Sequence, residues 1–166
     1  MPREGFPAPR GREKLLMSSV RLVDVSDENL AEVMSLKIRE DQRGFVPSIS
    51  SSLEKAAQHA SARPFAICTA TGEVIGFAMY GIDQEKGKWK IYRLLIDERY
   101  QGSGYGTSAT AALLESLSDD HNAGEVIIVY QTRNTIARKL YRKFGFVEYG
   151  TEDDKTLAAV NLKAAS

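Results

Sequence analysis

The chain of 166 residues contains one cysteine, Cys68, which excludes an internal disulfide. This residue lies in an apolar run, and the pattern predicts a buried, unreactive thiol. With two histidines in the whole sequence, we predict no metal site. A single free thiol fits a reducing compartment, so we expect a cytoplasmic protein.

Long apolar runs are also lacking. No stretch approaches the ~20 apolar residues of a membrane span, and the N-terminus has no apolar core of a secretory signal. An excess of either charge is missing too, because 22 basic and 22 acidic residues cancel. A chain without net charge lacks the excess of positive charge that is typical of a nucleic-acid-binding protein. We therefore expect neither a membrane nor a nucleic acid as partner.

The length allows one well-buried core and is too short for two ordinary domains. Residues 1–16 hold three of the five prolines and show no periodic pattern. We predict a flexible leader over 1–16 and a single domain over 17–166.

Hydrophobic periodicity predicts a mixed α/β order of elements. The predicted strands cover 20–25, 64–69, 74–82, 88–96, 125–130, 146–149 and 157–162, and the predicted helices cover 26–39, 105–118, 134–144 and a short segment opening at Ser51. Ser51 and Glu54 have capping-box spacing. The nearly continuous apolar run over 125–130 predicts a strand buried on both faces and parallel to 88–96.

The most informative segment is a glycine-rich loop between a strand and a helix, Gln101-Gly102-Ser103-Gly104-Tyr105-Gly106. Glycines let successive backbone N–H groups converge, and a helix N-terminus adds a positive dipole end, so this segment suits a pyrophosphate. The dinucleotide spacing Gly-x-Gly-x-x-Gly is not met, and the P-loop lysine is absent. The simpler alternative is a turn that only joins strand to helix.

Two motifs resemble the GCN5-related N-acetyltransferase (GNAT) family. Gln101, Gly104 and Gly106 match its signature Gln/Arg-x-x-Gly-x-Gly/Ala, and the segment 134–146 is similar to its Asn-x-x-Ala-x-x-Leu-Tyr-x-x-x-Gly-Phe motif. The resemblance covers about residues 20–162. It implies an α/β (α+β) fold with a central mixed, mostly antiparallel sheet of six or seven strands, helices on both faces, and splayed fourth and fifth strands.

The resemblance also implies acetyl-CoA as cofactor and assigns residues to it. The cofactor arm would lie against Leu94, Leu95 and Ile96, the pyrophosphate would bind the amides of Gln101, Gly102, Ser103, Gly104, Tyr105 and Gly106, and Asn134, Ala137 and Tyr141 would line the arm. The N–H of Leu95 would polarise the acetyl carbonyl.

Tyr141 is the predicted general acid. Asn134 and Tyr141 are seven residues apart and project from one helix face, which supports the pair. A tyrosine of pKa near 10 is a reasonable acid for a thiolate whose conjugate acid has a pKa near 8.5. The alternative for Tyr141 is a half-buried core aromatic. His59 and His121 are predicted to be surface residues, and the base stays unassigned.

Within the family, the segments 77–81 and 96–102 resemble the bacterial spermine/spermidine acetyltransferases. A polyamine needs carboxylates and aromatic faces, and the predicted candidates are Glu40, Asp41, Tyr80, Asp83 and Tyr92. Tyr92 precedes Arg93 where those relatives often carry an acid. An aminoglycoside, an amino acid, another small amine or a peptide N-terminus therefore stays open, as do a non-catalytic acyl-CoA sensor and a homodimer.

Overall fold

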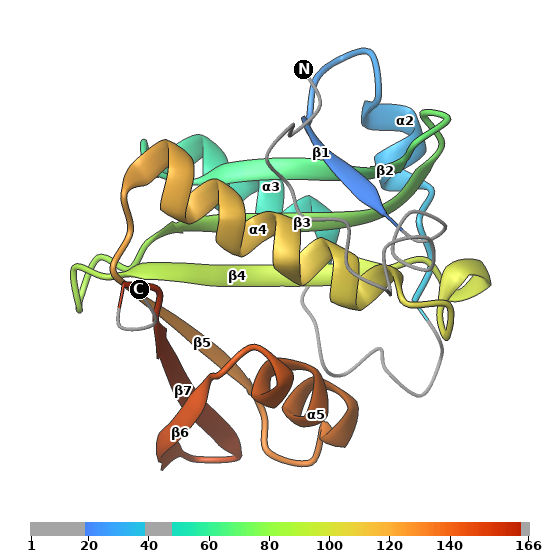
Figure 1. Ribbon diagram of the computed structural model, residues 1–166. Helices are drawn as coiled ribbons and strands as arrows, with labels where there is room; N and C mark the ends of the chain where they lie inside the picture. The colour runs from blue at the N-terminus through green and yellow to red at the C-terminus, as the bar shows by residue number, and fades with distance from the viewer. Residues whose placement is uncertain (1–18, 39–47, 164–166) are drawn as a thin grey trace.

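The computed structural model describes residues 19–38 and 48–163 (Figure 1). The strands are β1 (Val20–Asp24), β2 (Arg63–Thr69), β3 (Val74–Ile82), β4 (Trp89–Ile96), β5 (Glu125–Gln131), β6 (Val147–Glu152) and β7 (Lys155–Asn161). The helices of these residues are α2 (Leu30–Met34), α3 (Ile49–Gln58), α4 (Tyr105–His121) and α5 (Thr135–Lys143). The predicted leader lies outside the described residues, so the division into leader and domain stays a prediction.

The strands form one seven-stranded sheet in the order β1-β2-β3-β4-β5-β7-β6. Neighbouring strands are antiparallel except β4 and β5, which run parallel and are joined by α4. A parallel pair needs a long crossover, and the helix supplies it. The predicted mixed, mostly antiparallel sheet and the predicted parallel pair are confirmed.

β4 and β5 are paired over only part of their length. The ladder joins Trp89–Ile91 to Val126–Ile128 and then ends, although both strands continue. Figure 1 shows the two strands diverging from this point, with α5 beside the gap. The predicted splaying is confirmed, and it leaves the edge of β4 from Tyr92 onward without a strand partner on that side.

Helices cover both faces of the sheet, and each face has its own core. α4 packs across one face, where the core includes Leu113, Leu117 and Tyr141. α2 and α3 cover the other face, where Val33 and Phe77 are buried. Burial of these side chains on two sides explains why the central strands are nearly continuous apolar runs. The gap between β4 and β5 therefore opens between the two layers of helices.

The first predicted helix, over 26–39, is too long. The side chain of Asn29 accepts the N–H of Ser26 and donates to the carbonyl of Asp24, which holds the chain in a turn up to Leu30. Beyond Met34, the backbone of Lys37 bonds to the segment after β4 instead of continuing a helix. Tertiary hydrogen bonds thus override the spacing of apolar residues.

The second predicted helix begins earlier than expected. Ser48 is the N-cap of α3, and its Oγ accepts the N–H of Ser51 at 3.1 Å. Ser51 is therefore the third residue of the helix rather than its cap, and the predicted capping box with Glu54 is wrong. Ser48 and Ser51 have the same spacing, but only the N-cap bond is formed, because the Ser51 hydroxyl donates to the Ser48 carbonyl instead of accepting the Ser48 N–H.

Candidate active site

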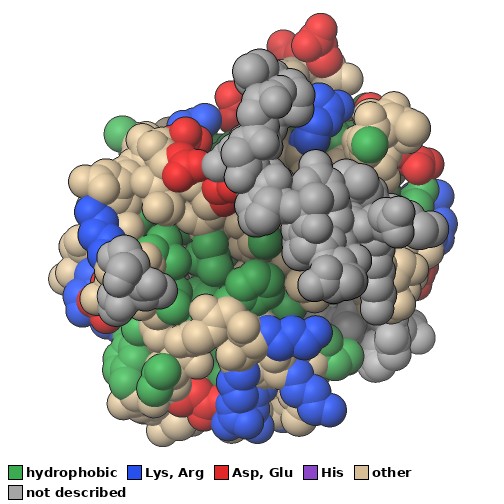
Figure 2. Space-filling view, in the orientation of Figure 1, with side chains coloured by type: hydrophobic (Ala, Val, Ile, Leu, Met, Phe, Trp, Pro, Cys, Tyr) green, Lys and Arg blue, Asp and Glu red, His purple; other side chains and the backbone are tan. Residues whose placement is uncertain are grey.

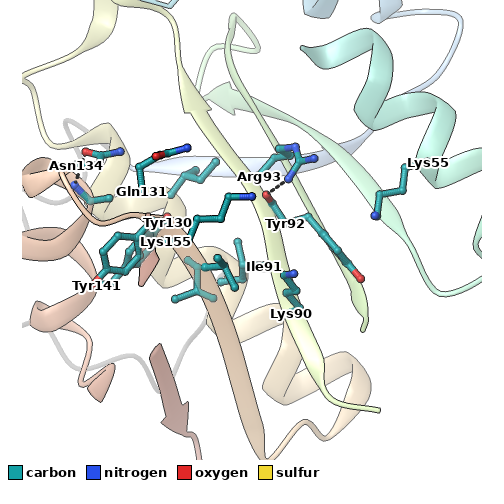
Figure 3. A pocket seen from close by; sticks show the side chains of 14 residues that line it. Lys55, Lys90, Ile91, Tyr92, Arg93, Tyr130, Gln131, Asn134, Tyr141 and Lys155 are labelled. Carbon is teal, nitrogen blue, oxygen red and sulfur yellow. Dashed lines mark hydrogen bonds between the residues drawn. The ribbon is translucent and has the colours of Figure 1, made fainter. Parts of the chain in front are cut away.

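A cavity of about 500 Å³ lies where β4 and β5 part (Figure 3). Its walls come from both strands, from α5 and from α3. The lining residues are Lys55, Lys90, Ile91, Tyr92, Arg93, Leu94, Ile128, Val129, Tyr130, Gln131, Asn134, Ala137, Tyr141 and Lys155. The cavity brings together five of the predicted site residues, namely Tyr92, Leu94, Asn134, Ala137 and Tyr141.

The ladder between β3 and β4 decides which amides of β4 face the gap. The N–H of Asp97 donates to the carbonyl of Ile75 on β3 at 2.8 Å. Backbone groups of an antiparallel strand alternate in direction, so Leu95, two residues earlier, also points its N–H toward β3. By the same alternation the amides of Leu94 and Ile96 face the gap.

The prediction that the N–H of Leu95 polarises an acetyl carbonyl is therefore not supported. The side chain of Leu95 is buried in the core beneath α2 and α3, and Leu94 lines the cavity. Side chains and amides alternate along β4, but which of them face the gap depends on the pairing with β3, which no local pattern shows.

The glycine-rich segment lies at the end of β4 and opens α4. Gly102 and Gly104 have φ of +84° and +90°, a left-handed conformation that a side chain disfavours. The first helical hydrogen bond joins Ser108 N–H to the Gly104 carbonyl, so the earlier N–H groups of α4 have no partner within the helix. Gln101 turns its carboxamide back and donates to the Ile96 carbonyl at 2.8 Å. Its side chain thus holds the loop against β4.

Asp97 anchors the start of this segment. Its carboxylate, 1% exposed, accepts the backbone N–H groups of Lys37 and Arg99 and the Nε–H of Arg99. Burial by itself raises the pKa of Asp97, but these hydrogen bonds outweigh it and the pKa is lowered. The ionised carboxylate ties the chain after α2 to the loop that precedes α4.

Asn134 and Tyr141 both line the cavity from α5, as the seven-residue spacing predicts. Asn134 is the N-cap of α5, and its Oδ1 accepts the N–H of Ala137 at 3.1 Å. The amide NH₂ group of Asn134 remains as a donor. The capping bond fixes the position of the side chain beside the gap.

Tyr141 is 7% exposed and packs between two aromatic rings. Its ring centroid lies 5.9 Å from that of Tyr130 and 5.5 Å from that of Phe146. Burial, and then the neighbouring Tyr130, raise the pKa of Tyr141 well above the ordinary tyrosine value. Within the described part of the chain, its hydroxyl has no hydrogen-bond partner. The phenol is thus held protonated, as a proton donor must be.

Tyr130 is itself held in place by Glu148. The carboxylate of Glu148 accepts the Tyr130 hydroxyl at 3.2 Å and lies 3.2 Å and 3.3 Å from the guanidinium groups of Arg138 and Arg142. These contacts join β5, β6 and α5 beside Tyr141. The aromatic wall of the cavity is therefore a fixed surface.

Two of the predicted substrate residues have structural positions instead. Tyr80 is completely buried, and its hydroxyl contacts Ser116 and His121 beneath α4, away from the cavity. Asp83 accepts the N–H of Lys86 in the turn after β3 and pairs with Lys90 at 3.6 Å. The prediction that Tyr80 forms a wall of the substrate site is wrong. Glu40 and Asp41 lie outside the described residues.

His121 also differs from its prediction as a surface residue. Its ring centroid lies 4.5 Å from that of Trp89, and its Nε2 is 3.1 Å from the Tyr80 hydroxyl. α4 continues to His121 rather than ending at Ser118, which brings the imidazole over the start of β4. No local signal in the sequence indicates this contact.

Sequence reasoning missed the basic side chains of the cavity. Lys55, Lys90, Arg93 and Lys155 line it, and none of the described lining residues is an Asp, Glu or His. Arg93 offered a signal, because a charged residue in the middle of a buried strand needs a reason. Lys55 and Lys155 come from distant segments and offered none. Gln131 also lines the cavity, and its buried Oε1 has no hydrogen-bond partner among the described groups.

A second set of cations lies on α5, outside the lining of the cavity. Figure 2 shows Lys and Arg side chains gathered over α5. The helix carries Arg138, Lys139, Arg142 and Lys143. Two of them, Arg138 and Arg142, pair with Glu148.

Comparison with known proteins identifies the family. Residues 21–146 match the sequence profile described as Acetyltransferase (GNAT) family. The match spans most of the chain, and the chain therefore belongs to this family of acyltransferases. Members of the family use acetyl-CoA.

Several relatives are polyamine or aminoglycoside acetyltransferases. The chain is 30% identical over 141 residues to a spermine/spermidine N(1)-acetyltransferase of Bacillus subtilis, covering 81% of this chain and 92% of that protein. Its fold is similar to spermidine N-acetyltransferase from Vibrio cholerae in complex with CoA and spermine, with a TM-score of 0.68, 17% identity, and coverage of 87% and 96%. The Vibrio cholerae enzyme also has a structure described as dodecameric. An aminoglycoside acetyltransferase in complex with coenzyme A has a TM-score of 0.71 at 24% identity, covering 88% and 96%.

No helix among the described residues is long and apolar enough to span a membrane. The described residues likewise contain no cluster of His, Cys, Asp and Glu side chains that could hold a metal ion.

Proposed function

We propose that this protein transfers the acetyl group of acetyl-CoA to the amine of a small molecule by direct attack in a ternary complex. The observation that carries the proposal is Tyr141, a residue only 7% exposed that lines a cavity at the gap between two parting strands. A phenol kept protonated at the centre of a cofactor-sized gap suits protonation of a leaving group.

The described residues fit the cofactor. The β4 edge beyond Ile91 has no strand partner on its β5 side, so its backbone can bond to an extended arm. The free N–H groups at the start of α4 suit a pyrophosphate, and the cations of α5 suit a further phosphate. The NH₂ group of Asn134 can donate to an amide carbonyl of the arm.

When bound, acetyl-CoA supplies the thioester whose carbonyl carbon the amine attacks and whose sulfur leaves. Leu94 N–H faces the gap and would polarise the carbonyl, in the place first predicted for Leu95. Tyr141 would donate its proton to the sulfur, so that CoA departs as a thiol. The new bond is between the amine nitrogen and the acetyl carbon, and the bond that breaks is between that carbon and sulfur.

The amine must lose its proton before it attacks. The described cavity lining contains no carboxylate or imidazole to accept this proton. We propose that ordered water carries the proton out of the cavity. The presence of Tyr141 disfavours the alternative of a non-catalytic acyl-CoA sensor.

Spermidine and spermine are acceptors that the Bacillus subtilis and Vibrio cholerae relatives support. A polyamine carries ammonium groups and binds best beside carboxylates. Among the predicted carboxylates, Asp83 is engaged in a turn and an ion pair, and Glu40 and Asp41 lie outside the described residues. The relatives therefore support a polyamine as acceptor, whereas the basic lining of the cavity disfavours one. Homodimerisation stays a prediction.

The test is a thiol-release assay with acetyl-CoA and a panel of amines, run beside calorimetry of acetyl-CoA binding. We expect binding of acetyl-CoA and turnover on at least one amine. Binding without turnover on any amine would favour the sensor. Absence of acetyl-CoA binding would contradict the proposal.

A further inference from the structure

Four cations line the cavity, and three of them, Lys55, Lys90 and Arg93, lie on the side of the sheet covered by α3. Arg93 and Tyr92 of β4 contact Ser52 and Lys55 of this helix. Tyr141 belongs to the opposite core, beneath α4 and α5. The cavity therefore has the proposed acid on one side of the gap and a cationic wall on the other.

Arg93 is the central member of this wall. Its Nε donates to the Ser52 hydroxyl at 3.0 Å, and another guanidinium nitrogen donates to the Tyr92 carbonyl. Both partners are neutral, and Arg93 has no carboxylate partner among the described residues. A half-buried guanidinium without a counter-ion is costly, because burial disfavours its charge. A bound anion would remove this cost.

The lysines extend the wall around Arg93. The Nζ atoms of Lys55 and Lys90 each lie 4.9 Å from the ring centroid of Tyr92. Asp83 pairs with Lys90, whereas no ion pair is found for Lys55 or Lys155 within the described part of the chain. In Figure 3 the side chain of Lys155 extends toward β4. Three elements, α3, β4 and β7, thus contribute cations to one cavity.

Lys90, at the start of β4, lies far from the predicted phosphate site. Lys90 is six residues before Ile96, and at about 3.3 Å per residue this separates it from the end of β4 by ~20 Å. The glycine-rich segment and α4 begin beyond that end. The distance separates Lys90 from the cofactor phosphates, whereas Arg93 is three residues, ~10 Å, before the end of β4. The side chain of Arg93 is directed to α3 by its bond to Ser52, not to the glycine-rich segment.

We propose that the acceptor is a small primary amine that also carries a carboxylate, such as an amino acid. This inference rests on the proposed acetyl transfer. The planar guanidinium of Arg93 suits a two-pronged contact with a carboxylate, and the lysines supply further positive charge.

The same wall favours the reactive form of the amine. A cationic neighbourhood destabilises an ammonium group relative to the neutral amine, so more of the bound acceptor is ready to attack. A polyamine brings several positive charges into this environment, with no carboxylate among the described lining residues to offset them. In the transfer itself the carboxylate does not react: the nitrogen gains the acetyl group and loses a proton to water, the sulfur takes the proton of Tyr141, and water returns a proton to Tyr141.

The test compares matched acceptors on the wild-type full chain. β-Alanine and n-propylamine differ by a carboxylate, and L-glutamate and L-glutamine differ by one negative charge; spermidine is the polyamine probe. We expect kcat/KM for β-alanine to exceed that for n-propylamine at least tenfold, and glutamate to exceed both glutamine and spermidine. Higher kcat/KM for spermidine than for β-alanine, L-glutamate and L-glutamine would overturn this inference and leave the acetyl transfer intact. No turnover on any amine would instead contradict the proposed function, and this inference with it.

Variants locate the carboxylate site. Arg93→Gln is expected to lower the ratio of kcat/KM for β-alanine over n-propylamine at least tenfold, while calorimetry still shows acetyl-CoA binding. Arg63→Gln is the matched control, since Arg63 pairs with Asp24 on the far strands and lies outside the cavity, and its ratio should not change. If Arg93→Gln fails to fold, Lys155→Gln, at an exposed lysine, must lower the ratio. An unchanged ratio in the folded variant, or loss of acetyl-CoA binding in it, would overturn the assignment.

Discussion

The surroundings of the Tyr141 hydroxyl favour a role as proton donor. It is buried between Tyr130 and Phe146, and its raised pKa keeps it protonated. We expect Tyr141→Phe to keep acetyl-CoA affinity and to lower kcat by about two to four orders of magnitude. Steady-state kinetics with calorimetry checks this. Tyr149→Phe, at an exposed tyrosine of β6, is the control; unchanged kcat in Tyr141→Phe would remove this residue from the mechanism.

The buried phenol also affects stability at alkaline pH. Because the pKa of Tyr141 is higher in the folded protein than the value near 10 of an unfolded chain, the unfolded chain releases this proton first. The free energy of unfolding therefore falls as pH rises above about 10, and this residue contributes up to about 1.4 kcal/mol per pH unit. Tyr141→Phe should lose less stability between pH 8 and pH 10.5 in urea denaturation. Equal losses in both proteins would show that the phenol titrates normally.

At the scale of elements, the proposed binding of the cofactor depends on the junction of β4 and α4. Gly104, at φ +90°, turns the chain so that the first N–H groups of α4 are free. Gly104→Ala should cost about 1–2 kcal/mol of stability and weaken CoA binding about tenfold, because the turn must relax. Gly87→Ala is a matched control, since Gly87 also has positive φ, at +66°, in the turn at the other end of β4. Calorimetry should show weaker CoA binding for Gly104→Ala alone; equal affinities would exclude the loop from the phosphate site.

At the scale of the whole molecule, binding of acetyl-CoA in the gap between β4 and β5 should stabilise the folded protein. A ligand that bridges β4, α4 and α5 binds the folded protein and not the unfolded chain. Acetyl-CoA at one hundred times its Kd should add about 2.7 kcal/mol, which raises Tm by about 5 to 10 °C in a protein of this size. Differential scanning calorimetry checks this, with NAD as the control. A larger shift with NAD than with acetyl-CoA would contradict the proposed cofactor.

Much of the fold follows from local patterns. The apolar run over 125–130 indicated a buried strand, and the ladder of β5 with β4 and β7 confirms it. The glycine at 145 ends α5 in a left-handed conformation, as expected for a helix C-terminus. Local spacing failed for the first two helices, where Asn29, Asp97 and Ser48 direct the chain through hydrogen bonds.

The sequence by itself determined the family, the order of the elements, the glycine-rich turn that opens α4 and the placement of Asn134 and Tyr141 on one face of α5. Each depends on residues close together in the chain, where turn chemistry and helical periodicity act. Only the tertiary structure decided that Leu94 faces the gap and not Leu95, because the phase of β4 depends on its register with β3. It alone brought Lys55, Arg93 and Lys155 to one cavity, since cations from three distant segments meet only when the sheet and α3 are packed together.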